Sequence, residues 1–546
     1  MNLYVFFVLV WVVQPLFGAR PATDEVIALF EQFGPIPRAS GNEEGMRSYI
    51  RRLVLQANAK EAGAILEEDA AGNMLVRIPG NGVLSEANGI ALHAHLDMVE
   101  ASELPGAFAA TPFSLVRSDG WIHAQKFERN LGLDNGLGVA MALRFLTNLS
   151  VPHPPLELLF TVSEESTMAG AASLEFSLRS NLLIDLDAEE AGSVCRGCQG
   201  ASLIKVVGSL KNDVGEFSPT ERFRISLSGL PGGHSGLQIH ENRLNAAKAA
   251  GEFLDNLRLN LPEARVINVR AGKREEEVVA TGTIPAFLEI DVALESRFSF
   301  KLDRISRVAV FDALGLDHPV GPNRRTAPDF KLNIESLGVT QSSGMSKTAQ
   351  ASLAKLLKQM PDGFLGFNSD FPNGVETSSN VVYFKIIDSG NGTSALEMLL
   401  HNRSFSKAAL GEAHNTKVDL LKKAFSGLDG GASIDIQELG PTAVWMTSSS
   451  SSVVERALRI GRLSKSKVIA GTLEMVFLTG KYPSMEMISI GPTIEEVHTP
   501  RERANIASLD ETIAALDRLL LGVTSNDTET PRTCADVLAQ SGKRKL

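Results

Sequence analysis

The chain has 546 residues, of which 44% are hydrophobic and 21% charged, and its formal net charge is −11. This balance is ordinary for a globular protein and leaves enough apolar material for about two to four domains. The acidic charge argues against a nucleic-acid partner, which needs a basic face, and three cysteines are too few for a disulfide framework.

The N-terminus carries an eleven-residue apolar run from Leu3 to Val13, followed by Gln14-Pro15 and a short stretch up to Ala19. The run is shorter than the ~20 residues that span a bilayer, so no stable membrane span is expected, but it suits the core of a secretory signal. We therefore expect residues 1–22 to be a signal peptide and the protein to be in the secretory pathway or extracellular. No Lys or Arg precedes the run, which leaves a buried strand or a membrane-surface anchor open, with a cytoplasmic location as the alternative.

The next part of the chain alternates short apolar runs with helical patterns. Ala22 to Gln56 reads as helical, with apolar residues from Val26 to Phe33 clustered as on one helical face and a break at Pro35 and Pro37. Gly136 to Leu149 also reads as a helix. Four short runs read as buried strands: Met74–Ile78, Ile90–Leu92, Leu156–Val162 and Leu182–Ile184. Strands that alternate with helices predict an α/β catalytic domain with a mixed, largely parallel sheet. Residues 23–200 are expected to form the first part of this domain.

From about Ala201 the pattern of apolar and polar residues changes. Alternating segments such as Arg222–Leu227, Phe287–Val292 and Val381–Ile387 are separated by helical ones, which predicts an inserted α+β module over residues 201–442. Residues 443–523 return to a strand, a turn and a helix and are expected to complete the first domain. Residues 524–546 are polar and basic, and are expected to be a disordered tail. The pair Cys195 and Cys198 has no second pair to accompany it, so we expect a structural or incidental role.

Acids and histidines stand where the predicted strands end. His95 and Asp97 follow one strand, Glu164 and Glu165 follow another, and Asp187 follows a third. Asp134 opens a helix, and His498 follows the strand and turn near the C-terminus. Each alone is an ordinary cap, turn or surface residue. Because ligands gather at the carboxyl ends of strands in open α/β sheets, the repeated pattern predicts a metal site.

Two divalent cations ~3.5–4 Å apart need one carboxylate to bridge them, and Asp134 suits that role. One ion would take His95 and Asp187, and the other would take Glu165 and His498. Zinc prefers such a nitrogen and oxygen set, with cobalt or manganese as alternatives. Glu164 is left to take the proton of the attacking water, and Asp97 is expected to accept the ring N–H of His95.

Several motifs resemble those of the M20 metallopeptidases, and within them the aminoacyl-histidine dipeptidase branch. They are Ile36-Pro-Arg-Ala-Ser-Gly-Asn-Glu-Glu44, His93-Ala-His-Leu-Asp-Met-Val99, Leu131-Gly-Leu-Asp-Asn-Gly136, Ser163-Glu-Glu165, Asp187-Ala-Glu-Glu190, Gly232-Gly-His-Ser-Gly236, and Ile490-Gly-Pro-Thr493 with His498-Thr-Pro500. The resemblance runs from about Val26 to Leu521 in matching order and spacing.

The resemblance implies a zinc-exopeptidase-like catalytic domain interrupted by an inserted lid domain, two zinc or similar ions, and the ligand roles given above. It also implies that His234 in the lid steadies the oxyanion, that Arg403 holds a substrate carboxylate and that Asn380 binds the peptide. One departure is Ala470-Gly-Thr-Leu-Glu-Met475, where the family often has His-Ala-Gly-Leu-Glu-Cys, and this puts the histidine preference in doubt.

We therefore expect a hydrolase that cleaves small dipeptides, of the Xaa-His or carnosine-like type, with a homodimer as one possible assembly. The alternatives are an N-acyl amino acid deacylase that uses the same metal centre and a secreted binding protein of the same fold that has lost its activity. The second alternative is disfavoured because the expected general base and metal ligands are all intact, namely His95, Asp134, Glu164, Glu165, Asp187 and His498.

Overall fold

The computed structural model describes residues 21–522, apart from 103–107, 214–219, 234, 237, 273–281, 316–324, 341–342, 429–432 and 441. Residues 1–20 of the expected signal peptide lie outside the described residues, and so do the expected tail and His234. Over the described part, helices that are both long and apolar enough to cross a membrane are absent. The chain divides into two compact units: one runs up to Ser193 and adds Arg456–Lys465 and the residues from Ser489, and the other comprises Val194–Glu455 and Ser466–Ile488.

The first unit is an α/β fold, as predicted. Its helices are α1 (Ala22–Phe33), α2 (Glu44–Asn58), α3 (Leu133–Thr147), α4 (Ala169–Ala172) and α11 (Ile506–Leu521). Its main strands are β1 (Ile65–Glu68), β2 (Met74–Ile78), β3 (Ile90–His95), β6 (Leu156–Thr161) and β7 (Leu182–Asp185), in the spatial order β1-β2-β6-β3-β7. Strand β3 pairs in parallel with both β6 and β7, whereas β1 and β2 join antiparallel, so the expected mixed sheet is confirmed.

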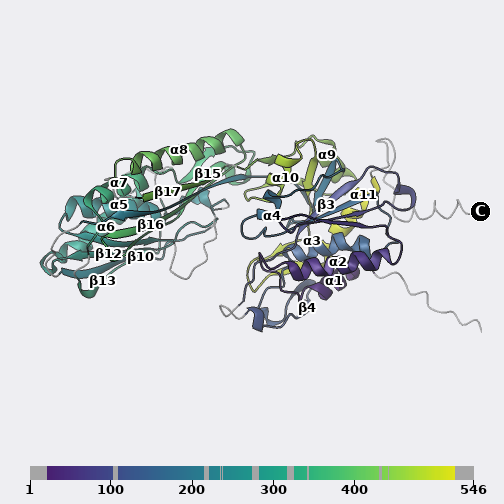
Figure 1. Cartoon of the computed structure of the whole chain (residues 1–546), viewed down its shortest axis with the longest axis horizontal. Helices are drawn as coiled ribbons and strands as arrows, with labels where there is room; N and C mark the ends of the chain where they lie inside the picture. The colour runs from purple at the N-terminus through teal and green to yellow at the C-terminus, as the bar shows by residue number, and fades with distance from the viewer. Residues whose placement is uncertain are drawn as a thin grey trace, which may run out of the picture. The chain divides into compact units, whose positions relative to one another are not determined.

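Burial explains these elements. All six residues of β3 and of β6 are buried, as expected for central strands covered on both faces. The apolar residues predicted to share one face of α1, among them Val26, Phe30 and Phe33, are buried. Helix α3 packs on β3, and α1 and α2 pack on α3, so the three helices lie together (Figure 1). A second, four-stranded sheet has the order β21 (Ile494–Glu495), β22 (Arg503–Asn505), β5 (Trp121–Ala124), β4 (Leu115–Ser118).

The second unit is built on a large antiparallel sheet of nine strands. The order is β13-β10-β12-β11-β15-β16-β9-β17, with β14 paired to β15. These strands are β9 (Gly200–Lys211), β10 (Thr220–Ser228), β11 (Arg265–Ala271), β12 (Leu288–Leu294), β13 (Lys331–Thr340), β14 (Gly363–Phe367), β15 (Val375–Asp388), β16 (Thr393–Ser404) and β17 (Ser433–Leu439).

Helices α5 (Ala246–Asn260), α6 (Phe300–Leu314), α7 (Lys347–Gln359) and α8 (Lys407–Phe425) cover one face of this sheet (Figure 1). The core lies between them, and alternate residues of β10 such as Phe223, Ile225 and Leu227 point into it. The unit also holds most or all of β8 (Ser193–Cys198), β18 (Trp445–Met446), β19 (Lys465–Ile469), α10 (Met475–Lys481) and β20 (Glu486–Ser489), and the first half of α9 (Ser452–Arg459).

Candidate metal centre

Strand ends bring the expected ligands of the first unit to one edge of its sheet. His95 is the last residue of β3, Glu164 and Glu165 follow the end of β6, and Asp187 follows the end of β7. Because β6, β3 and β7 run in parallel, their carboxyl ends meet at the same edge. Asp134 lies at the start of α3, which packs on β3.

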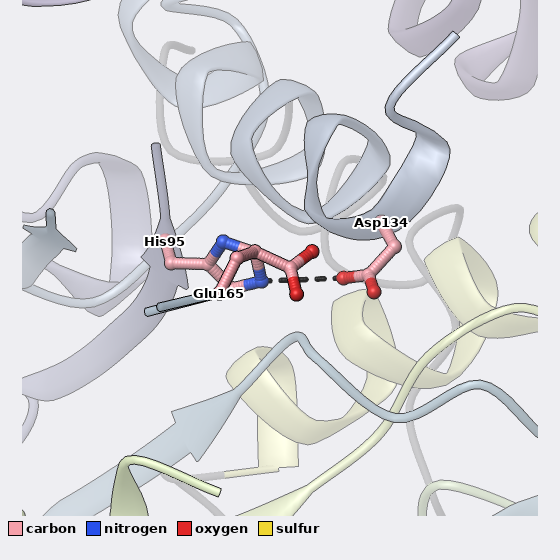
Figure 2. A group of neighbouring side chains, drawn as sticks. All are labelled: His95, Asp134 and Glu165. Atoms are coloured by element: carbon pink, nitrogen blue, oxygen red, sulfur yellow. Dashed lines mark hydrogen bonds and ion pairs between the residues drawn. The ribbon is translucent and has the colours of Figure 1, made fainter. Parts of the chain in front are cut away.

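Asp134 occupies the centre of the cluster. Its Oδ1 lies 3.2 Å from Nε2 of His95, and its Oδ2 lies 3.2 Å from Nε2 of His498. Nε2 of His498 also lies 2.9 Å from Oε2 of Glu165, and Nε2 of His95 lies 3.3 Å from Oδ1 of Asp187. Figure 2 shows His95, Asp134 and Glu165 converging, with one possible ligand atom of each within 4.8 Å of the others. Each oxygen of Asp134 thus faces a different imidazole.

Charge makes this cluster a good cation site. Burial lowers the pKa of His498, but the carboxylates of Asp134 and Glu165 outweigh it and raise that pKa to about 11. Carboxylates also raise the pKa of the buried His95 well above its usual value. Burial raises the pKa of Asp187 to about 7. Protons on the imidazoles therefore offset the carboxylates when no metal is bound, and a cation would take over that role as it displaces them.

Asp97 has more contacts than the sequence suggested. It is fully buried, and its Oδ1 lies 3.5 Å from Nδ1 of His95, which is longer than the expected hydrogen bond and leaves Nδ1 without a hydrogen-bond partner among the described residues. Its two oxygens also accept the backbone N–H of Glu164 at 3.0 Å and of Glu165 at 3.1 Å, and Ser40 Oγ donates to it at 2.7 Å. One carboxylate therefore contacts the histidine and also holds the turn that carries Glu164 and Glu165.

Four further buried residues around the ligands were not identified from the sequence. Glu43 accepts the N–H of Ser163 at 3.0 Å, and Asn73 accepts the N–H of Val162 at 3.2 Å, so both hold the end of β6. Arg38 and Glu502 lie beside the loop before Asp134. Burial lowers the pKa of Arg38 to about 10 and raises that of Glu502 to about 7. Arg38 and Glu43 stand inside a motif quoted above, but nothing local to the sequence indicates what they contact.

The residues expected to bind substrate belong to the second unit, where Asn380 is on β15 and Arg403 on the adjacent β16. Asn380 is 2% exposed, donates to the carbonyl of Thr283 at 2.6 Å and accepts from Asn245 at 2.9 Å. Arg403 donates to Thr472 Oγ1 at 2.8 Å, and burial lowers its pKa to about 10. Both side chains are therefore held by hydrogen bonds within the second unit.

Comparisons with known proteins agree over nearly the whole chain. The sequence profile of Peptidase family M20/M25/M40 matches residues 91–522. The cytosol non-specific dipeptidase of Escherichia coli (strain K12) is 30% identical over 505 residues, which cover 90% of this chain and 96% of that protein. The crystal structure of aminoacylhistidine dipeptidase from Vibrio alginolyticus has a TM-score of 0.69 and 25% identity, covering 93% of this chain and 99% of that one. A tripeptidase from Staphylococcus aureus shares the fold, with a TM-score of 0.53 and 15% identity. The match covers 92% of this chain and 98% of that one.

Proposed function

Because the chain belongs to peptidase family M20/M25/M40, we propose that it is a metal-dependent dipeptidase whose two divalent ions are held by His95, Asp134, Glu165, Asp187 and His498. One observation carries this proposal: the two oxygens of Asp134 lie 3.2 Å from the imidazoles of His95 and of His498. A carboxylate with one oxygen toward each of two histidines has the arrangement that a bridging ligand needs.

The donor atoms suit zinc, which binds imidazole nitrogen and carboxylate oxygen, with cobalt and manganese as the alternatives. Metal bound here would supply Lewis-acid polarisation of the peptide carbonyl and activation of a water molecule. In this proposal Glu164 takes the proton of that water and hands it to the leaving amine. Asp97 supports the assignment because its Oδ1 accepts the backbone N–H of Glu164, which fixes the point from which that side chain projects.

Residues 201–442, which form most of the second unit, would bind the substrate and act as the lid domain. Arg403 would hold the carboxylate of the peptide, Asn380 would contact its backbone, and His234 would steady the oxyanion. Burial supports the role of Arg403, since a guanidinium removed from water pairs strongly with a carboxylate. We assign residues 201–442 to the lid and residues 23–200 with 443–523 to the catalytic domain.

The relatives support small peptides as substrates. One is named a non-specific dipeptidase and another an aminoacylhistidine dipeptidase, so we propose dipeptides, including the Xaa-His type. The first name also places that relative in the cytosol, which supports the cytoplasmic alternative for this chain. A homodimer remains a proposal that light scattering of the purified chain would test.

A substrate panel on the metal-loaded protein tests the proposed function. We expect cleavage of Ala-His, β-Ala-His and other dipeptides, little action on N-acetyl amino acids, and loss of activity with a chelator. Preference for N-acetyl amino acids would instead identify a deacylase. Fewer than two ions per chain together with no hydrolysis of any substrate would favour a binding protein and overturn the proposal.

A further inference from the structure

Two buried charged side chains, Arg38 and Glu502, connect three of the chain segments that carry the expected ligands. Arg38 is fully buried and precedes α2 in sequence, and Glu502 is 1% exposed and lies four residues after His498. Neither side chain has been given a part in the reaction. Their hydrogen bonds go to backbone groups of the segments that carry His95 and Asp134.

Glu502 holds the loop at the start of α3. Its Oε2 accepts the N–H of Leu131 at 2.9 Å and of Gly132 at 2.8 Å, and its Oε1 lies 3.3 Å from the N–H of Asp134. The first N–H groups of a helix have no partners within the helix, and a carboxylate is stabilised there. Glu502 therefore couples the segment of His498 to the backbone of Asp134, 368 residues away.

Arg38 makes the matching connection through carbonyl groups. Its Nη1 donates to the carbonyls of Leu96 and Asp97 at 3.3 and 3.2 Å, and its Nη2 donates to that of Gly132. The guanidinium thus spans the segment after His95 and the loop before Asp134. Gly132 leaves the space for it, because a Cβ there would lie 2.4 Å from Nη2 of Arg38.

We propose that Glu502 and Arg38 are positioning residues of the metal centre, which hold Asp134 at a fixed distance from His95 and from His498. This inference rests on the proposed function. Metal ligands must be held within about 0.5 Å of the productive geometry, and hydrogen bonds to the ligands and their segments provide that accuracy. Removing such a partner costs about 10- to 100-fold in metal affinity.

The test is Glu502→Gln, which has almost the same shape but loses the charge and one accepting oxygen. Glu157→Gln is the matched control, because Glu157 is a buried carboxylate in the same unit that accepts the backbone N–H of Arg179 and of Ser180 at 2.9 and 2.8 Å. It lies near the start of β6, whereas the ligands follow the end of that strand. Urea unfolding of both metal-free variants measures what each change costs in stability alone.

Cobalt binding to the metal-free full-length chain is then measured in competition with a chelator, together with the visible absorption of the bound Co²⁺. We expect Glu502→Gln to weaken binding of at least one ion about 10- to 100-fold and to change the absorption bands. Glu157→Gln should bind like the wild type even where it loses as much stability. At saturating metal, Glu502→Gln should lower kcat and leave KM for a dipeptide nearly unchanged, because the contacts to the substrate remain.

Wild-type cobalt affinity and absorption in Glu502→Gln would overturn the positioning role, and so would an equal loss of affinity in Glu157→Gln. Should Glu502→Gln fail to fold, Glu502→Asp and Arg38→Lys carry the same test, since both keep the charge and displace the contact. Arg144→Lys, at a buried arginine paired with Asp517, is the control for Arg38. If the wild type itself binds fewer than two ions and cleaves no dipeptide, the proposed function fails instead.

Discussion

Oδ2 of Asp134 lies 3.2 Å from Nε2 of His498, although 364 residues separate the two in the chain. The other oxygen of Asp134 lies at the same distance from His95, which ends a central strand of the sheet. This relationship depends on the C-terminal segment returning to the unit that the N-terminal part begins. It makes one carboxylate the shared point of two halves of the candidate metal centre.

Replacing the shared carboxylate should therefore affect both halves. Asp134→Asn keeps one oxygen but loses the negative charge that two cations would share, so we expect the number of bound ions to fall from two to one or none. Metal analysis after gel filtration measures this. Asp119→Asn, the same change at an exposed turn between β4 and β5, should keep both ions. Two tightly bound ions in Asp134→Asn would show that another residue bridges them.

The role of Glu164 as a general base can be tested separately from metal binding. Glu164→Ala should keep both ions and lower kcat by about 10²- to 10⁴-fold, the usual contribution of a general base. Steady-state kinetics on a dipeptide with parallel metal analysis provides the measurement. Glu175→Ala removes an exposed carboxylate of the same unit and should leave kcat unchanged. Wild-type turnover in Glu164→Ala would mean that another group accepts the proton.

Gly132 has a positive φ and also lacks room for a Cβ, whereas Gly120 shares only the positive φ. The φ of Gly132 is +70°, and a Cβ would lie 2.4 Å from Arg38 Nη2 and 2.6 Å from Met98 Sδ. Gly120 has a φ of +81° but nothing within 4 Å of a Cβ, so Gly120→Ala adds conformational strain alone. We expect Gly132→Ala to lower the free energy of unfolding in urea by at least about 1 kcal/mol more than Gly120→Ala does. Equal losses would mean that Arg38 and Met98 move aside freely.

A buried lysine in the second unit should make the free energy of unfolding depend on pH. Lys417 on α8 donates to the carbonyls of Asn380 and His401, and burial lowers its pKa from 10.5 to about 7. Between these two values the unfolded chain holds a proton that the folded chain lacks, so stability rises with pH across that window. One such group contributes up to about 1.4 kcal/mol per pH unit.

Lys417→Met removes this titration, so the free energy of unfolding should rise less between about pH 7 and pH 9 than it does in the wild type. Urea unfolding at both values measures the difference. Lys423→Met, at an exposed position of the same helix, should keep the wild-type slope. An unchanged slope in Lys417→Met would mean that Lys417 keeps its proton in the folded protein.

Much of the fold could be predicted because its signals are local. The apolar runs Met74–Ile78, Leu156–Val162 and Leu182–Ile184 form β2, β6 and β7 to within a residue. Burial on both faces makes a central strand apolar along its whole length, which a short window of sequence reveals. The acids and histidines that follow such runs could be selected for the same reason.

The sequence by itself determined which residues are chemically able to bind metal and that several of them follow buried strands. Only the tertiary structure decided that Asp134 lies between His95 and His498, that Asp97 holds the turn of Glu164 and Glu165, and that Glu502 accepts the N–H groups before α3. These contacts join segments far apart in the chain and involve backbone groups, which every residue carries. No spacing or periodicity marks them, because they arise only when packing brings the segments together.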